Sequence, residues 1–419
     1  MEFYNTFAKE YLNALSNMRN DYLIKLELLS DNETTIGEII RDLSSTDGQI
    51  NINYEQITRR SCSLSLINID RKYMPNKNGN FWLNRKFKLW IGLVVRDNVY
   101  WWSQGVYYAQ SAVVNNGTVN IEAVDKGGVL DGTLKLGMTD SQYVIKRNRK
   151  LVDVVSDLLT LRVGEVDIVN KGNMRLGGDR VLDCILPHIN TVYKNEVIQA
   201  ELSIDANEYI GELMNKLAEL YAAEIYYDAD GHFVFEPYVD NSGYSYMPTQ
   251  LTFTNLSSFF EEANYNYTFD GENAVCVYTN SNETGVRNVA WTAYNTNPLS
   301  PLNISTGIRR APHQEIEYYD TSEEQMNKDC RSAANYYLRH HSLIGMQLDF
   351  NCPIIPHIDV NKTIEISDNA HDIANGIFVV QSVTIPLNSN AMSISCSNIN
   401  WLPNDTTYDG VSEILEGDD

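Results

Sequence analysis

The sequence has no long hydrophobic run. Its longest uninterrupted apolar stretch covers residues 89–95 and includes Gly92, whereas a membrane-spanning helix needs roughly 20 apolar residues. Charged residues recur through residues 1–22, so this stretch lacks the apolar core of a signal peptide. We therefore predict no membrane segment and expect synthesis in the cytoplasm.

Positive charge is scarce. The 419 residues include 32 Lys and Arg against 55 Asp and Glu, a formal net charge of −23. Because phosphate binding needs clustered basic residues, this balance argues against a protein that holds nucleic acid or docks on an anionic membrane. The excess is uneven: residues 1–150 contain 19 basic and 16 acidic residues, and residues 151–419 contain 13 and 39. Residues 404–419 hold six acids and no base, which predicts a solvated, flexible tail.

Closely spaced cysteines are also missing. The six cysteines stand at long, unrelated spacings with no C-x-x-C pair, so a zinc ribbon or a redox motif is not expected. Cys62, Cys352 and Cys396 alternate with polar neighbours, as small core residues on strands do. We predict that the cysteines are buried free thiols.

No motif of catalysis is present. The glycine pairs at 127–128 and 177–178 lack the Lys-Ser/Thr of a phosphate loop. The segment 228–231 resembles the start of a calcium loop, but its glycine comes two residues early, which favours a hairpin turn. Adjacent His340 and His341 would point about 100° apart on a helix, so they suit the helix dipole better than a metal ion. We predict no enzyme, no catalytic residue, no cofactor and no metal ion.

Two sugar-directed alternatives stay open from the residues alone. Acidic pairs can cleave glycosidic bonds, but 55 acids make that signal unspecific. Trp101 and Trp102 could stack on a sugar, yet they lie in an expected strand pair. There, a role in the core or in a subunit contact is commoner.

The sequence does contain clear strand and helix patterning. Apolar residues make up 43% of the chain, enough for several cores. Residues 1–20 predict an N-terminal helix with a stripe at Phe3, Phe7, Tyr11 and Leu15. Residues 21–145 alternate apolar and polar positions, with a hairpin signal at Asn116-Gly117, and predict a first small antiparallel β-barrel.

The pattern changes after residue 145. Residues 146–250 combine helical spacing with a hairpin and predict an α+β middle domain, in which Asp205 and Glu208 form a candidate capping box. Residues 251–403 return to strands around one helix, capped by Ser322 and Gln325, and predict a second barrel. The predicted fold class is therefore mainly β, with two small antiparallel barrels and an intervening α+β domain.

A self-match across 271 positions links the two expected barrels. Segment 105–111 aligns without gaps onto 376–382, and each copy follows a lysine-led strand and leads into a hairpin. The paired positions are Gly105 and Gly376, Tyr107 and Phe378, Gln110 and Gln381, and Ser111 and Ser382. Two unrelated hairpins could match by chance, since alternation is common to all strands. We favour an internal repeat, because the glycine, the aromatic residue and the Gln-Ser pair stand in register.

The repeat has a geometric consequence. Three such chains around a threefold axis would present six similar barrels, which approximates sixfold symmetry. A homotrimer of this kind can meet a hexameric ring on one face and a trimeric partner on the other.

The order of these patterns resembles the baseplate hub proteins of phage tails and of related contractile injection particles. The resemblance covers residues ~20–401. Its segments run from Arg59 to Asp125 for a first barrel, from Leu202 to Pro237 for a middle domain, and from Ser322 to Val380 for a helix and a second barrel. Many hubs carry a further C-terminal lysozyme, peptidase or fibre region. This sequence stops soon after Trp401, so we expect cell-wall cleavage or host recognition to come from another protein.

The resemblance implies a structural virion protein of the tail tip or baseplate, made in the host cytoplasm. It implies a homotrimer that joins the hexameric tail tube or distal ring to a trimeric spike or fibre. DNA would pass through it without being bound, and acids fit such a channel because carboxylates repel phosphate. We expect some of the acids in residues 151–419 to face that channel. The alternatives are a carbohydrate-binding receptor protein at the tail tip and a virion-associated cell-wall hydrolase.

Overall fold

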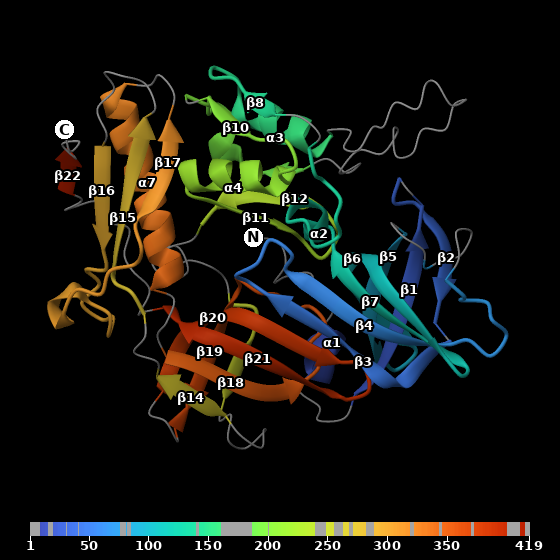
Figure 1. Ribbon diagram of the computed structural model, residues 1–419. Helices are drawn as coiled ribbons and strands as arrows, with labels where there is room; N and C mark the ends of the chain where they lie inside the picture. Colours follow the sequence, from blue (N-terminus) through green and yellow to red (C-terminus); the bar gives the residue numbers. More distant parts are fainter. Residues whose placement is uncertain are drawn as a thin grey trace, which may run out of the picture.

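The computed structural model describes residues 9–15, 20–30, 32–40, 42–75, 81, 85–139, 142–160, 187–199, 201–238, 249–254, 263–267, 271–281, 289–318, 322–342, 346–369, 373–399 and 411–414. These residues form a mainly β structure around one long sheet, flanked by two smaller α/β units (Figure 1). No helix among them has the length and apolar character needed to cross a membrane.

The first half of the long sheet is built from the N-terminal part of the chain. Its strands are β1 (Asp21–Leu29), β2 (Thr35–Ile39), β3 (Leu43–Asn53), β4 (Arg60–Ile67), β5 (Lys86–Val95), β6 (Asn98–Asn115) and β7 (Thr118–Asp125). The hairpin predicted at Asn116-Gly117 is confirmed: Asn115 pairs with Thr118, and Gly117 adopts a φ of 83°. Helix α1 (Lys9–Leu15) lies against this half, with Tyr11 packed on Tyr100 and Trp102.

The second half of the long sheet comes from the C-terminal part. Its strands are β13 (Thr252–Thr254), β14 (Asn264–Tyr267), β18 (Met346–Pro353), β19 (Thr363–Asp368), β20 (Ile373–Pro386) and β21 (Ala391–Asn398). The pairing path is β14-β18-β21-β20-β3-β4-β7-β6-β5-β1-β2, with β19 branching from β20 and β13 from β19. One hydrophobic core continues through both halves.

Neither half closes as a barrel among the described strands, so the prediction of two barrels is not confirmed. The pairing path has open ends at β14 and β2, and β3 of the first half pairs with β20 of the second. The two halves therefore share one continuous sheet. The alternation of apolar residues correctly indicated strands, but such alternation does not specify whether the outermost strands meet.

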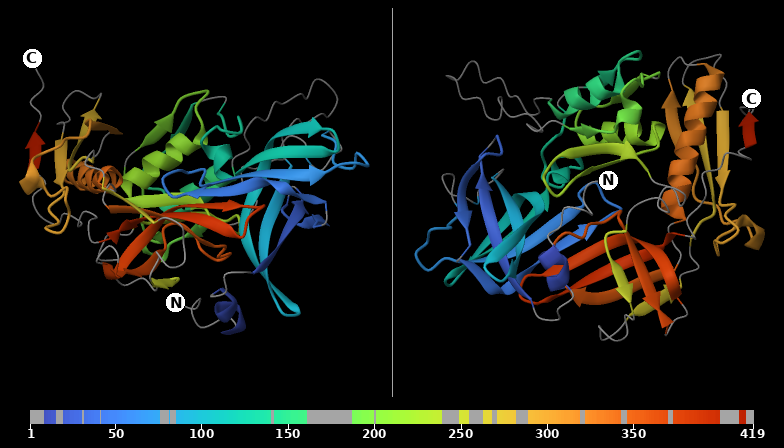
Figure 2. Two further views of the ribbon diagram at one scale, coloured as in Figure 1. Left: turned by 90° about the horizontal axis from the view of Figure 1, so that it is seen from below. Right: turned by 180° about the vertical axis from the view of Figure 1, so that it is seen from behind.

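The middle unit packs beside the long sheet (Figures 1 and 2). Its elements are α2 (Gly127–Leu130), β8 (Tyr143–Ile145), α3 (Leu151–Leu159), β9 (His188–Ile189), β10 (Leu202–Ile204), α4 (Ile210–Leu220), β11 (Ala223–Tyr227) and β12 (Phe233–Pro237). Helix α4 begins at Ile210 after Tyr209, later than the Asp205 capping box predicts. Glu208 does reach back to the Asp205 amide, but it closes a turn before the helix.

A fourth group of elements forms a separate sheet with one helix. It contains β15 (Ala274–Ser281), β16 (Val289–Tyr294), β17 (Gln314–Tyr318), α7 (Glu323–His341) and β22 (Val411–Ile414). These strands pair with each other and not with β18–β21, so residues 251–403 do not form one sheet around a helix as predicted. The predicted cap of α7 is confirmed, since the Ser322 side chain accepts from the Gln325 amide. Strand β22 also corrects the prediction of a wholly solvated tail, because it pairs with β16.

Several local predictions can be compared with the side chains. Of the five described cysteines, all are free and four are buried, whereas Cys276 is half-buried; Cys184 lies outside the described residues. His340 does not complement the helix dipole, because burial lowers its pKa to about 3 and keeps the ring neutral. His341 instead contacts Glu272, with Nδ1 and Oε2 2.5 Å apart.

Candidate functional site

The residues of the predicted repeat occupy matching places in the two halves of the long sheet. In the first half β5, β6, β7 and β4 lie side by side in that order; in the second half β19, β20, β21 and β18 do the same. Each set follows the same chain order and is antiparallel throughout. The eight predicted residues lie on β6 and β20 and form no single site.

The glycine and the aromatic residue of each copy are in mutual contact. A Cβ atom on Gly105 would lie 2.8 Å from the ring of Tyr107, and one on Gly376 would lie 3.0 Å from the ring of Phe378. Both rings are fully buried. Each aromatic side chain therefore folds back over the glycine two residues before it, so any larger residue would collide with the ring. This contact gives a physical reason for the Gly-x-aromatic pattern.

The glutamines mark β-bulges at the same point of both strands. Gln110 is the extra residue between Ala109 and Ser111 in the pairing of β6 with β7. Gln381 is the extra residue between Val380 and Ser382 in the pairing of β20 with β21. A bulge bends its strand and redirects the residues after it. Past each bulge, β6 and β20 leave the neighbours that they had before it, β5 and β19.

Beyond the bulge, the two copies differ in what covers their edge. Residues 382–386 of β20 pair with residues 49–53 of β3, which joins the two halves. Residues 111–115 of β6 pair only with β7 among the described strands. Ile385 is fully buried at the joined edge, whereas Val114, its counterpart in β6, is 43% exposed. The first half thus carries an open strand edge where the second half carries a covered one.

An ion pair with a buried guanidinium joins the two halves of the long sheet. Arg60 of β4 donates through Nη2 to both oxygens of Asp359, at 2.7 and 2.6 Å. Arg60 is almost fully buried, and Asp359 raises the pKa of its guanidinium. The Arg60 amide also donates to Asp125, whose pKa is raised to about 7 by burial.

Glu224 of β11 connects the middle unit to both halves of the long sheet. Its carboxylate accepts from the Tyr54 hydroxyl and from Arg59, both of the first half, the latter at 3.2 Å. It also accepts from Asn361 of the second half at 3.0 Å. Because all these groups lie away from water, each depends on its partners, and the units are held in one relative arrangement.

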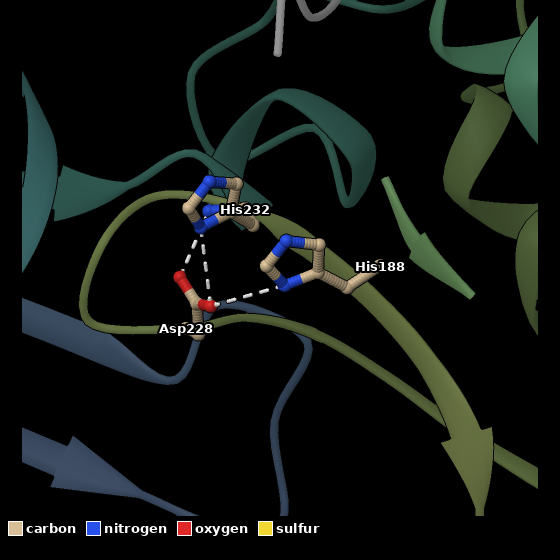
Figure 3. Close-up of side chains that lie close together, drawn as sticks. All are labelled: His188, Asp228 and His232. Atoms are coloured by element: carbon tan, nitrogen blue, oxygen red, sulfur yellow. Dashed lines mark hydrogen bonds and ion pairs between the residues drawn. The ribbon is translucent and has the colours of Figure 1, made fainter. Parts of the chain in front are cut away.

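A separate cluster of side chains lies at the β11–β12 hairpin (Figure 3). His188 of β9 and His232 direct their Nδ1 atoms toward Asp228 Oδ2, at 3.7 and 3.3 Å respectively. The two imidazole rings are stacked, with centroids 4.1 Å apart. The predicted hairpin turn over 228–231 is confirmed, but no pattern in the sequence indicated His188. It stands 40 positions before Asp228 and reaches the hairpin through a two-residue parallel strand.

Comparisons with known proteins connect this fold to tail proteins. No family model and no curated protein sequence matches the chain. A tail protein from Neisseria meningitidis MC58 matches with a TM-score of 0.54 and 12% identity, over 90% of this chain and 96% of that one. The 43 kDa tail protein of prophage MuSo2 from Shewanella oneidensis matches with a TM-score of 0.53 and 11% identity, over 91% and 99%.

These likenesses bear on the fold, because the identities are low. Both extend along nearly the full length of both chains, so they include the long sheet as well as the smaller units. The resemblance to tail hub proteins predicted from the sequence is confirmed to that extent. The chain has the fold of these two tail proteins.

Proposed function

We propose that this protein is a structural, non-enzymatic hub of a phage tail, a homotrimer with two copies of one β unit in each chain. The fold that it shares with two tail proteins supports this proposal. The main support for a trimer is the pairing of β20 with β3, together with the unpaired edge at the matching place on β6 among the described strands. The junction inside one chain serves as the template for the junction between chains.

The strand that should cover β6 can be derived from that template. Strand β3 covers β20 and is paired on its other side with β4. In the second half, β18 is the equivalent of β4. Strand β14 pairs with β18, so β14 is the equivalent of β3. Strand β14 lies at one end of the pairing path, with no second neighbour among the described strands. Residues 111–115 of one chain would therefore pair with β14 of the next.

The template also fixes the register. Ile50 pairs with Cys62, which in turn pairs with Ala123. Tyr265 pairs with Leu348, which in turn pairs with Cys396. Ala123 and Cys396 occupy matching positions in the two copies, so Ile50 and Tyr265 are equivalent. Ile385 faces Ile50 inside the chain. By the same rule, Val114 would face Tyr265 of the next chain, and Val113 would face Asn266. The partly exposed Val114 would then be covered as Ile385 is.

Repeating this junction three times gives a closed ring of six similar units. Such a ring matches a hexameric tail tube or distal ring on one face, while its true threefold symmetry suits a spike or fibre on the other. It would lie at the tail tip or baseplate of the virion after synthesis in the host cytoplasm. We place part of the acidic excess of residues 151–419 on the channel, where DNA would pass without binding because carboxylates repel phosphate.

The two alternatives have less support. Trp102 lies against Tyr11 and His357, so it is occupied by packing rather than presented to a sugar. A cell-wall clearing assay on the purified protein tests the hydrolase directly. Clearing above background would favour that alternative over a hub without catalysis.

The trimer is tested by the mass of the purified protein in solution, alone and mixed with the neighbouring tail proteins of the same particle. We expect a species of three chains of 47.6 kDa each. A chain that stays monomeric in every such mixture would contradict the proposal.

A further inference from the structure

The cluster at the β11–β12 hairpin contains the side chains of a metal site. His188 enters from β9, while Asp228 and His232 stand on either side of the hairpin turn (Figure 3). One ligand atom from each residue can be chosen so that all three lie within 4.8 Å of one another. The cluster is independent of the edges used for the trimer, which lie on β6 and β14.

The backbone holds the carboxylate of Asp228 in place. Its Oδ1 accepts hydrogen bonds from the amides of Asp230 and His232, each at 2.9 Å. The turn is closed by the Asp228 amide, which donates to the His232 carbonyl at 3.0 Å. With Oδ1 occupied, Oδ2 is left facing the two imidazoles at 3.7 and 3.3 Å, close to the roughly 3.3 Å that separates two ligand atoms of a tetrahedral zinc ion.

The imidazole of His232 adds an observation that points to a ligand. Its Nδ1 atom is inaccessible to solvent and makes no hydrogen bond, although Asp228 Oδ2 is 3.3 Å away. A buried nitrogen that makes no hydrogen bond costs stability. A metal ion between the rings and Oδ2 would satisfy it.

We propose that His188, His232 and Asp228 bind a divalent transition-metal ion such as Zn²⁺ through two imidazole nitrogens and one carboxylate oxygen. Imidazole with carboxylate suits zinc, nickel or cobalt better than magnesium or calcium, which prefer oxygen ligands. Three protein ligands leave the remaining coordination position to water.

Binding requires a small movement of His188. The planes of the two rings are 17° apart, and the rings are stacked. The lone pair of an imidazole nitrogen lies in the plane of its ring, so a single ion cannot lie in the planes of both stacked rings at once. His188 is the mobile member, because its side chain is 59% exposed whereas that of His232 is 31% exposed. Turning the His188 ring about its side-chain torsions brings its Nδ1 toward the ion.

The ion would strengthen a joint between units. The same hairpin turn contacts the first half of the long sheet: Asp230 pairs with Lys88 at 2.7 Å, and the Gly231 carbonyl accepts from Lys126 at 2.8 Å. Linking β9 to this turn fixes the surface that docks there. An ion that binds only the folded chain also raises its stability by mass action.

The test uses the full-length protein stripped of metal with a chelator and titrated with Zn²⁺ by calorimetry, with Co²⁺ as a spectroscopic probe. We expect saturable binding of one ion per chain, a visible Co²⁺ absorption band typical of nitrogen ligands, and a higher Tm with Zn²⁺. His188→Ala, His232→Ala and Asp228→Asn should each weaken binding at least tenfold. The exposed His313 lies outside the cluster, so the control His313→Ala should bind like the wild type.

His188→Ala is the decisive variant, because the residue is exposed and its loss leaves the hairpin intact. Circular dichroism verifies its folding before each titration. The proposal is overturned if the wild type shows no saturable binding. It is equally overturned if a folded His188→Ala protein binds Zn²⁺ with unchanged affinity.

Discussion

Arg60 and Asp359 stand 299 positions apart and form an ion pair, in which one nitrogen of the buried guanidinium donates to both oxygens of the partly exposed carboxylate. The pair joins β4 of the first half to the loop before β19 of the second. It shows how the two halves, although separate in sequence, are fixed to each other by more than the β20–β3 ladder.

Removing the carboxylate of this pair should destabilise the protein. Asp359→Asn leaves the Arg60 guanidinium, whose side chain is 3% exposed, without its counter-charge, which we expect to cost about 3 kcal/mol of unfolding free energy. Urea denaturation measures this. The control is Glu10→Gln, which breaks an exposed pair with Arg96 and should leave the midpoint unchanged. Equal effects of the two variants would contradict the role assigned to Arg60 and Asp359.

Gly105→Ala should destabilise the first half through a collision with the Tyr107 ring. The φ of Gly105 is 144° and the added Cβ would lie 2.8 Å from that ring, so we expect a loss of about 1–3 kcal/mol. In a Tyr107→Leu background the added cost of Gly105→Ala should be smaller, because the ring is gone. Gly37→Ala is the control, since its nearest contact would be 3.6 Å. An undiminished cost in the Leu background would show that the ring is not the cause.

Acidification should lower the stability of the fold through protonation of His357, which contacts Tyr11 of α1. Tyr11 Oη lies 2.7 Å from His357 Nδ1, and burial lowers the pKa of His357 to about 4. The unfolded chain binds a proton near pH 6.5, so stability rises with pH between about 4 and 6.5 and is lost as pH falls through this window.

The size of this effect is up to about 3 kcal/mol. The difference in unfolding free energy between pH 7 and pH 4.5 should be smaller by this amount in His357→Gln than in the wild type. His313→Gln, at an exposed position, should keep the wild-type difference. Identical pH profiles for wild type and His357→Gln would rule out the imidazole as the source.

An aspartate at the open edge should prevent assembly without unfolding the chain. Val114 is 43% exposed, so Val114→Asp costs the monomer little, but in the proposed ring it would bury a charge against the next chain. We expect monomers by light scattering. Val144→Asp, at a 37% exposed position on β8, is the matched control and should still form trimers. Trimers of Val114→Asp at wild-type affinity would place the interface elsewhere.

Local features of the fold were predictable from the sequence because neighbouring residues determine them. The Asn116-Gly117 turn and the Ser322 cap depend on a few consecutive residues and were predicted correctly. The matching Gly-x-aromatic pattern could be found in the sequence because Gly105 and Gly376 each lie under an aromatic ring that leaves no room for a side chain. These constraints act within two or three positions, and they leave a pattern in the sequence.

Long-range features left no such pattern. The pairing of β3 with β20 depends on residues more than 300 positions apart. No local motif indicates that β3 pairs with both halves of the sheet. The same holds for β22, which pairs with β16 from within an acidic segment. His188 was likewise missed, because a two-residue strand carries no periodicity. Tertiary packing decides all three.

The most direct test of the proposed ring is a cross-link between its predicted partners. Val113→Cys and Asn266→Cys are introduced together, at two exposed positions that the template places opposite each other in neighbouring chains, and the protein is oxidised under native conditions. We predict covalent dimers and trimers on a denaturing gel, with no trimers from either single variant. A double variant that is trimeric by mass yet stays uncross-linked at this pair would contradict the β6–β14 junction.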